Sequence, residues 1–544
     1  MELLEWIEIN KTKEKRKLRD SRYFDLWLVG GVCFLTLLFG IIYVLLSKTV
    51  YFWDNSTYWD IGRLLSQKPL NWDFFKEVYN SIGTNDYNYF VAVPVALWMK
   101  VFGTTRVSYV IAVILFYVVP TQIVIYLIAR HMKRTRLAFV VSILCIPAFV
   151  YNAVIGFIDV AGVLIGLLCY YLYFTDVLRN KPYIKSIILG VLLVLIMITR
   201  RYFAFFAVSF VTVMVLNTIL FKKSFKELAI TISVIAIMLI LCFYPFLVNI
   251  LLKNYGKLYS SYKYSVFTDF KLITRYFGVV FVLLLFGLGI YLAIKKKELR
   301  CLSAIMQIVI CASMFMLTQT HGQQHLLMYI PPLIMLVMFA VDGIDKKGLI
   351  ITLSVVALLN FLSPSINRVQ PKNIQEIKTL SLFPSYSVKP ETRSDINAIL
   401  ALKRNLDKKI PEGENCGVLA SSFTLNSSIL INVVPSLNKK EIRQDNYIIG
   451  LPEVDSRDYW RLNELYQCGY LLVATPAQTH LSPKEQIIIV QAVKSFDEGT
   501  DIANSFMEIT DFKTKIGDVD VRLYKRIKEV SETEKTEFEL KLYK

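Results

Sequence analysis

Long apolar segments dominate the first two thirds of the chain and end near Phe361. Most of them approach the roughly 20 mostly apolar residues that an α-helix needs to cross the hydrocarbon core of a bilayer. The pattern predicts eleven transmembrane spans, at 24–47, 107–129, 137–155, 158–178, 185–199, 202–221, 228–251, 276–294, 301–318, 326–341 and 346–362. We therefore expect a polytopic α-helical membrane protein.

Basic residues gather in alternate loops between these spans, and this distribution predicts the orientation of the chain. Loops rich in Lys and Arg tend to stay in the cytoplasm. A basic segment precedes the first span, and five further clusters fall on its side of the membrane: Arg130–Arg136, Arg179–Lys185, Lys222–Lys226, Lys295–Arg300 and Lys346–Lys347. The N-terminus is therefore expected in the cytoplasm, and an odd number of spans places the C-terminus outside.

The apolar stretch 89–102 is treated separately from the spans. It has only about 14 residues, fewer than a spanning helix needs, and it contains Pro94. Counting it as a span would move every later basic loop to the other side of the membrane. We therefore interpret it as an interfacial or re-entrant helix.

After residue 366 the composition becomes polar, and short apolar runs alternate with helical segments as in a small α/β domain. Helices are predicted at Asp395–Lys409 and Pro483–Phe496, and strands at Gly417–Ser421, Tyr470–Ala474 and Asp518–Tyr524. The expected organisation is a cytoplasmic basic segment (1–22), a transmembrane domain (23–366) with a first outer loop (48–106), a linker (367–393), an extracytoplasmic α/β domain (394–528) and a charged tail that we expect to fray (529–544).

The composition agrees with a membrane protein. Apolar residues make up 55% of the chain, and much of the net charge of +18 lies in the predicted cytoplasmic loops. There it would face anionic lipid headgroups, so no nucleic-acid partner is needed to explain it. Six of the eight cysteines lie in or beside spans. Cys416 and Cys468 share the C-terminal domain, where a disulfide is compatible with the sequence but not required by the spacing.

The first outer loop carries the first candidate for chemistry. Asp54 follows the first apolar run closely and lies in an aromatic group with Trp53, Tyr58 and Trp59. Aromatic residues at a membrane boundary are often an interfacial belt, and Asp54 could simply be a helix N-cap. The functional alternative is an aspartate that deprotonates a hydroxyl or binds a cation at the outer surface.

Three more candidate groups fall in outer hairpins. Asp159 lies among apolar residues, where an ionisable group is costly, although an N-cap for the next helix is the competing interpretation. Arg200 and Arg201 break the positive-inside pattern and would suit an anionic lipid phosphate, or ordinary headgroup contact. His321 and His325 flank Gln324 in a polar hairpin, where they could bind a metal or a phosphate. His480, in the C-terminal domain, is interpreted as a surface histidine.

The order of these features resembles the GT-C-type membrane glycosyltransferases, in particular the bacterial members of the protein O-mannosyltransferase and aminoarabinose-transferase group. The matching features are Trp53-Asp54-Asn55, the run Pro94–Gly103, Asp159, Gln324-His325 with Pro331-Pro332 after it, and Gly469–Leu481. Many relatives have two adjacent acids where this chain has Asp54 and Asn55. A metal role for this loop is therefore open, and Asp60 or Asp86 could replace Asp159 as the second carboxylate.

The resemblance implies an inverting transfer of a sugar from a polyprenyl-phosphate-linked donor to an acceptor hydroxyl of a cell-envelope polysaccharide, lipid or protein. This would take place at the outer face of a bacterial plasma membrane. Asp54 would be the general base and Asp159 its support; if a divalent cation takes part, these two aspartates would hold it. The donor phosphate would be bound by Arg200, Arg201, His321, Gln324 and His325, and sugar or prenyl groups would stack on Trp53, Tyr58 and Trp59.

Two other classes of protein handle lipid-linked sugars. A flippase or transporter would be expected to carry charges near the bilayer midplane and paired broken helices. An O-antigen-type polymerase or ligase would be expected to have a large polar loop between late spans. In this chain most charges lie at the ends of spans, the long loop comes first, and the soluble domain comes last.

Overall fold

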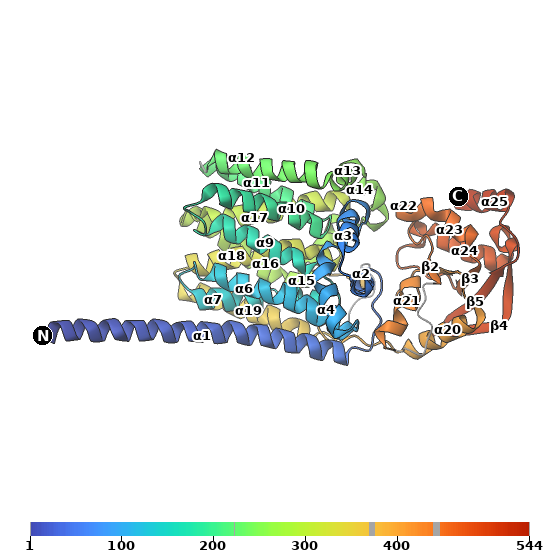
Figure 1. Ribbon diagram of the computed structural model, residues 1–544, viewed down its shortest axis with the longest axis horizontal. Coiled ribbons are helices and arrows are strands. Elements are labelled where there is room, and N and C mark those ends of the chain that lie inside the picture. Colours follow the sequence, from blue (N-terminus) through green and yellow to red (C-terminus); the bar gives the residue numbers. More distant parts are fainter. Residues whose placement is uncertain (1, 222–223, 369–375, 439–446, 543–544) are drawn as a thin grey trace.

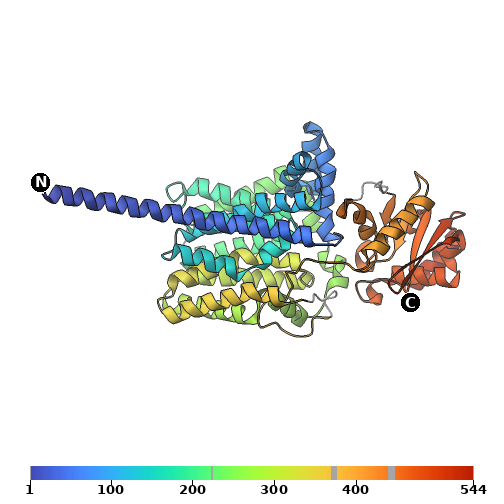
Figure 2. The same ribbon diagram turned by 90° about the horizontal axis from the view of Figure 1, so that it is seen from below.

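The computed structural model describes residues 2–221, 224–368, 376–438 and 447–542. Several parts of the sequence predictions lie outside these ranges: Lys222 and Lys223 of one basic cluster, residues 369–375 of the linker, 439–446 of the α/β domain and 543–544 of the tail, and the side chains of the N-terminal basic segment. A helical bundle and a C-terminal domain follow one another along the long axis of the molecule (Figure 1). Helix α1 (Glu2–Leu46) runs along one edge of the bundle, and its N-terminus lies at the end away from the C-terminal domain (Figures 1 and 2).

Eight segments of the described chain are long and apolar enough to cross a membrane, so the protein is a multi-pass membrane protein as predicted. They are Tyr23–Leu46 in α1, Arg106–Ala129 (α5, Arg106–Val113; η2, Ile114–Val118; α6, Val119–Ala129), Pro182–Thr199 (α10), Phe203–Phe221 (α11), Phe225–Cys242 (α12, Phe225–Ile237; η3, Met238–Cys242), Leu299–Thr318 (α17), Gln323–Gly343 (η5, Gln323–Tyr329; α18, Ile330–Gly343) and Lys347–Ile366 (α19). Two further candidates are pairs of helices bent by 54° and 90°: α7 (Thr135–Cys145) with α8 (Ala148–Val154), and α15 (Val266–Phe277) with α16 (Val279–Lys295).

The remaining predicted span, 158–178, is helix α9 (Val160–Phe174), which has only 15 residues. At 1.5 Å per residue it is about 22 Å long, less than the hydrocarbon thickness of about 30 Å. It packs against α6, α10 and α18 inside the bundle. Neighbouring helices therefore surround α9 for much of its length, and its short apolar run is covered by protein.

Short helices lie between the bundle and the C-terminal domain (Figure 1). They are α2 (Asp54–Gln67), α3 (Trp72–Thr84), η1 (Phe90–Ala92), α4 (Val93–Phe102), α13 (Tyr244–Leu252), α14 (Tyr255–Leu258) and η4 (Ser260–Tyr262). Helix α4 covers most of the stretch 89–102 and packs against α2 and α5. Its ten residues reach about 15 Å, which is too short for a span and agrees with the interfacial interpretation.

The C-terminal domain is built on one five-stranded sheet of order β2-β1-β3-β5-β4. The strands are β1 (Cys416–Leu419), β2 (Ile448–Gly450), β3 (Tyr470–Thr475), β4 (Phe506–Ile516) and β5 (Val519–Arg526). The neighbours of β1 are parallel to it, and β5 is antiparallel to both β3 and β4. Its helices are α20 (Ile396–Lys409), α21 (Ser427–Ser436), α22 (Asp455–Asp458), η7 (Tyr459–Arg461), α23 (Leu462–Gln467), η8 (Pro483–Glu485), α24 (Ile487–Glu498), η9 (Asp501–Ser505) and α25 (Glu532–Leu542).

Strand β3 is apolar from Tyr470 to Ala474 because both faces of the sheet are covered. Tyr470 and Leu472 belong to the core under α20 and α21, whereas Leu471 and Val473 belong to the core under α24. Successive side chains of a strand point to opposite faces, so a continuous apolar run is typical of a strand buried on both sides. The predicted strands and helices coincide with β1, β3, β5, α20 and α24, while β2, β4 and α21 were not predicted.

The charged tail does not fray as expected. Residues Glu532–Leu542 form α25, and the Phe538 side chain is fully buried in the core of the domain. Glu534 accepts hydrogen bonds from the Ser505 and Ser531 hydroxyls. A buried aromatic ring and the hydrogen bonds of Glu534 therefore attach a segment whose composition alone suggests a solvated end. Cys416 and Cys468 are both buried and free, so the structure contains no disulfide between them.

The packing of helix α9 depends on its close approach to α11, and a substitution in α9 tests this contact. A Cβ atom at Gly162 would lie 2.2 Å from Cζ of the Phe203 ring. We expect Gly162→Ala to destabilise the purified protein by about 1–3 kcal/mol, because the ring or the backbone has to shift. Thermal unfolding in detergent measures this. The matched control is Gly287→Ala in α16, where a Cβ meets nothing within 4 Å; equal melting temperatures for the two variants would contradict the packing.

Candidate active site

The candidate site begins at the start of α2, where the backbone is held in an unusual conformation. Trp53 has a φ of 49°, in the left-handed region that non-glycine residues rarely occupy, at a cost of order 1–3 kcal/mol. Its N–H donates to the Ser428 hydroxyl (3.0 Å), and its ring packs against Phe423 and His480. These three partners belong to the C-terminal domain, which therefore holds the residue directly before Asp54.

Asp54 is the first residue of α2, where the helix dipole favours a negative charge. Its carboxylate accepts hydrogen bonds from the Tyr87 hydroxyl and from Nε2 of Gln324, the latter at 2.8 Å. Nη2 of Arg200 lies 4.0 Å away. The Asp54 side chain still exposes 30% of its surface. The result is a carboxylate that is held from one side and open on the other.

Asp159 is brought close to this carboxylate by the hairpin between α8 and α9. Gly156 in that hairpin has a φ of 107°, and a Cβ there would lie 2.7 Å from the Asn55 carbonyl oxygen, so glycine permits the approach. Asp159 occupies the N-cap position of α9, but its side chain makes no capping bond. It instead accepts hydrogen bonds from the Tyr202 hydroxyl (2.8 Å) and pairs with Nε of Arg200 (3.1 Å).

Arg200 lies between the two carboxylates and is almost fully buried. Its side chain is 9% exposed, and its guanidinium carbon lies 4.1 Å from the centre of the Tyr87 ring. The rings of Tyr58 and Tyr202 are also within 6 Å, so cation–π contacts add to the ion pair. Burying a charge is costly unless it is paired and hydrogen-bonded. Arg200 meets this condition through Asp159.

The adjacent Arg201 points to a different carboxylate. It pairs with Asp86 and donates to the Tyr255 hydroxyl at 3.2 Å. Lys253 also lies 3.5 Å from Asp86. Two cations thus share one carboxylate that is 46% exposed. The pair of arginines predicted as one phosphate site is therefore divided between Asp159 and Asp86, with a surplus of positive charge beside Asp86.

The two histidines of the hairpin before α18 have different environments. His321 is fully buried: Nδ1–H donates to Asp269, and Nε2 accepts from the Tyr329 hydroxyl, each at 2.5 Å. Both ring nitrogens are thus occupied, which leaves no free nitrogen of His321 for the predicted contact with the donor phosphate. His325 accepts from the Gly322 N–H at Nδ1 (2.8 Å), and its ring packs against Tyr202. Nε2 of the neutral ring then carries the proton.

Two of the predicted stacking aromatics are also not accessible. Tyr58 and Trp59 expose none of their surface, and Nε1 of Trp59 donates to the Thr104 carbonyl at 3.0 Å. They pack the loop onto the bundle, and neither ring has an exposed face for the predicted stacking on a sugar. Trp53 is partly exposed. His480, interpreted as a surface histidine, is partly exposed, and its ring packs 4.5 Å from that of Trp53.

The arrangement does not fit a divalent cation between Asp54 and Asp159. The Arg200 guanidinium already pairs with Asp159 and reaches toward Asp54. Within the described ranges, no group of three or more His, Cys, Asp or Glu side chains could hold a metal. The alternative second carboxylates have partners of their own: Asp86 pairs with Arg201, and Asp60 pairs with Arg63 at 3.2 Å. Asp60 also accepts from Nδ2 of Asn432 in the C-terminal domain.

Tyr87 and Tyr202 are members of the site that the sequence analysis missed. Each donates a phenolic hydrogen bond to one of the two carboxylates. Tyr202 directly follows the unusual Arg200-Arg201 pair, and Tyr87 follows Asp86 in the first loop. Their positions next to these charged residues in the sequence could therefore have identified both tyrosines as candidates. The pairing of each tyrosine with its carboxylate, however, depends on contacts between distant loops.

Arg200 and Asp159 form a buried pair whose disruption is measurable. We expect Arg200→Met to lower the free energy of unfolding by about 3–5 kcal/mol, because Asp159 is left as an unpaired buried charge. Adding Asp159→Asn to this variant removes that charge and should restore part of the loss. Arg179→Met is the control, because Arg179 is 78% exposed and an exposed pair contributes at most about 1 kcal/mol. Denaturation in detergent that does not distinguish Arg200→Met from this control would contradict the pairing.

The contact of His480 with Trp53 predicts a dependence on pH. Burial lowers the pKa of His480 to about 4, whereas an unfolded histidine has a pKa of about 6.5. The unfolded state therefore binds a proton that the folded state does not, and stability falls as the pH is lowered from about 6.5 to 4. His480→Gln should make this fall shallower in thermal unfolding. His131→Gln, at an exposed histidine, should leave it unchanged; an unaltered slope in His480→Gln would count against a buried neutral ring.

The similarity of this chain to known proteins lies in its fold. No protein-family model and no curated protein sequence matches this chain. Among solved structures it is similar to ArnT from Cupriavidus metallidurans in the apo state, with a TM-score of 0.57 and 12% identity over 92% of this chain and 98% of that one. The form bound to undecaprenyl phosphate gives 0.53 and 11%, over 92% and 97%.

A weaker similarity, with a TM-score of 0.43 and 12% identity, is found to the oligosaccharyltransferase of Archaeoglobus fulgidus with a tethered acceptor peptide. The match covers 90% of this chain and 73% of that one. The likeness to ArnT extends over both parts of the chain. The protein therefore has a GT-C-like fold: a polytopic helical membrane domain followed by a C-terminal α/β domain.

Proposed function

We propose that this protein is an inverting glycosyltransferase that moves a sugar from a polyprenyl-phosphate-linked donor to an acceptor hydroxyl. The observation that carries the proposal is the Asp54 carboxylate, partly open and held beside the buried Arg200 at the end of the bundle that faces the C-terminal domain. A base next to a fixed cation is what transfer from a lipid phosphate requires. The GT-C-like fold supports the same class of reaction.

Asp54 would act as the general base. The acceptor hydroxyl loses its proton to the carboxylate while its oxygen attacks the anomeric carbon of the donor sugar. Tyr87 and Gln324 donate to Asp54 and keep the carboxylate oriented. Since Asp54 exposes 30% of its side chain, an acceptor can approach its free side.

The leaving group would be the polyprenyl phosphate, whose negative charge grows as the glycosidic bond breaks. Arg200 is the fixed cation nearest to the base, and His325 offers an N–H beside Tyr202. The surplus positive charge of Arg201 and Lys253 around Asp86 lies on the same surface. Preorganised cations and donors of this kind stabilise developing charge without reorganising during the reaction.

The accessibility of the two aspartates favours inversion. A retaining mechanism uses a second carboxylate as a nucleophile. Asp159 exposes only 1% of its surface and is occupied by Arg200 and Tyr202. It would therefore act as a positioning residue for Arg200. A single displacement by the acceptor oxygen inverts the anomeric centre.

The proposed setting is the outer face of a bacterial plasma membrane, with the N-terminus in the cytoplasm and the C-terminal domain outside. The basic loops at the other end of the bundle favour this orientation. Undecaprenyl phosphate is bound in one of the ArnT structures, and a lipid of that class is the carrier we propose. The acceptor would be a glycan, lipid or protein of the cell envelope.

Sugar transfer by the purified protein tests the proposal. The assay supplies a panel of radiolabelled polyprenyl-phosphate sugars together with native membrane acceptors. We expect Asp54→Asn to lower kcat by about 10²–10⁴-fold, the usual contribution of a positioned base. Asp73→Asn is the matched control, since Asp73 is an exposed acid in the adjacent helix α3. Melting temperatures confirm that both variants are folded.

The remaining outcomes separate the alternatives. Full transfer by Asp54→Asn would keep the enzyme class but remove Asp54 as the base. Retention of the anomeric configuration in the product would exclude the single displacement. Movement of lipid-linked sugar across proteoliposomes without any transfer would favour a flippase instead.

A further inference from the structure

A cavity with both charged and apolar side chains in its wall lies in the bundle, far from the candidate active site. It has a volume of about 210 Å³ and is lined by residues of four helices, α9 to α12. Tyr173 stands near the end of α9, whereas Asp159 directly precedes the start of that helix. The cavity therefore lies at the end of the bundle opposite to Asp54 and the C-terminal domain. Neither Asp54 nor that domain contributes residues to its wall.

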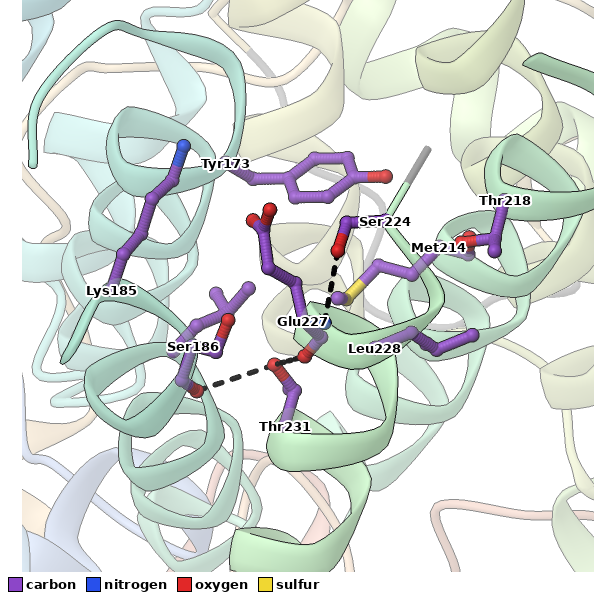
Figure 3. Close-up of a pocket in the computed structure, with 10 residues that line it drawn as sticks. Tyr173, Lys185, Ser186, Met214, Thr218, Ser224, Glu227, Leu228 and Thr231 are labelled. Carbon is purple, nitrogen blue, oxygen red and sulfur yellow. Dashed lines mark hydrogen bonds between the residues drawn. The ribbon is translucent and has the colours of Figure 1, made fainter. Parts of the chain in front are cut away.

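Two side chains of opposite charge face this cavity. Lys185 of α10 and Glu227 of α12 both extend toward Tyr173 (Figure 3). Among the residues described, neither forms an ion pair, and the Lys185 ammonium has only a 3.5 Å contact with the Thr175 carbonyl. By contrast, the Thr231 hydroxyl of the wall is already bonded to the Glu227 and Ser186 carbonyls. The two charged groups can therefore still form hydrogen bonds with a ligand, whereas the Thr231 hydroxyl is already bonded within the protein.

The position of these residues along their helices corresponds to the level of lipid headgroups. Lys185 is in the first turn of the span Pro182–Thr199, and Glu227 is in the first turn of Phe225–Cys242. Apolar side chains, Leu189, Met214 and Leu228, line the cavity as well. A ligand there would meet charges at one level and hydrocarbon deeper in the membrane.

The cavity also has a neighbour that faces lipid. Helix α12 lies at the edge of the bundle (Figure 1), and only 11% of the residues in the apolar window of its span are buried, the smallest share of the eight described spans. The cavity is therefore bounded on one side by a helix whose outer surface faces lipid.

We propose that this cavity binds the headgroup of a zwitterionic phospholipid that carries a primary amine, such as phosphatidylethanolamine. Its phosphate would pair with Lys185, and its ammonium would pair with Glu227 and donate hydrogen bonds. A purely anionic headgroup would leave Glu227 beside like charge. A quaternary ammonium has no N–H to donate to the carboxylate. This site is separate from the proposed transfer reaction and does not depend on it.

Native mass spectrometry of the delipidated full-length protein tests the site. We expect phosphatidylethanolamine to bind about tenfold more tightly than phosphatidylglycerol of the same acyl chains. Glu227→Gln should bring this ratio close to one, and Lys185→Gln should weaken binding of both lipids. Asp176→Asn is the control, since Asp176 lies near the same end of the bundle but is 78% exposed. It should keep the wild-type ratio.

Other results would overturn the assignment. Equal binding of the two lipids by the wild type, or an unchanged ratio in a folded Glu227→Gln variant, would exclude selection by the two charges. Soluble glycerophosphoethanolamine offers the same headgroup without acyl chains. If it competes at concentrations equal to those of the lipid, the cavity takes a free zwitterion and not a membrane lipid.

Discussion

The site depends on one interaction, the ion pair of Arg200 with Asp159 beneath the Asp54 carboxylate. A guanidinium at this depth is tolerable only if a carboxylate neutralises it. Asp159 supplies that negative charge and is itself buried. Asp54 can then remain partly exposed while a fixed cation lies beside it. The division of labour between the two aspartates, one positioning and one accessible, follows from their different exposure.

The second constraint comes from the C-terminal domain. Ser428, Phe423 and His480 hold Trp53 in a left-handed conformation, and Asp60 accepts from Asn432 of the same domain. Strain of this kind persists only where surrounding contacts determine it. The domain is thus part of the structure that presents Asp54. Its sheet, apolar on both faces, is the rigid support for α21 and for the loop that carries Phe423.

The two ends of the bundle have different chemistry. At the end next to the C-terminal domain, charged side chains are paired and surrounded by tyrosines. At the other end, Lys185 and Glu227 face a cavity beside a lipid-exposed helix. The two groups of residues are separated by the length of the spans. A substitution at one end therefore does not alter contacts at the other. Both ends still use the same principle, since charges near a membrane are kept where partners or water can satisfy them.

The sequence by itself determined the membrane class, most of the apolar segments, the α/β pattern of the C-terminal domain and the candidate residues Asp54, Asp159 and Arg200, because runs of apolar residues and misplaced charges are local signals. Only the tertiary structure decided which charges meet. It separated Arg200 from Arg201, buried His321, Tyr58 and Trp59, and joined Tyr87 and Tyr202 to the carboxylates. Residues far apart in the chain make these contacts, and burial depends on packing between loops that no local pattern encodes.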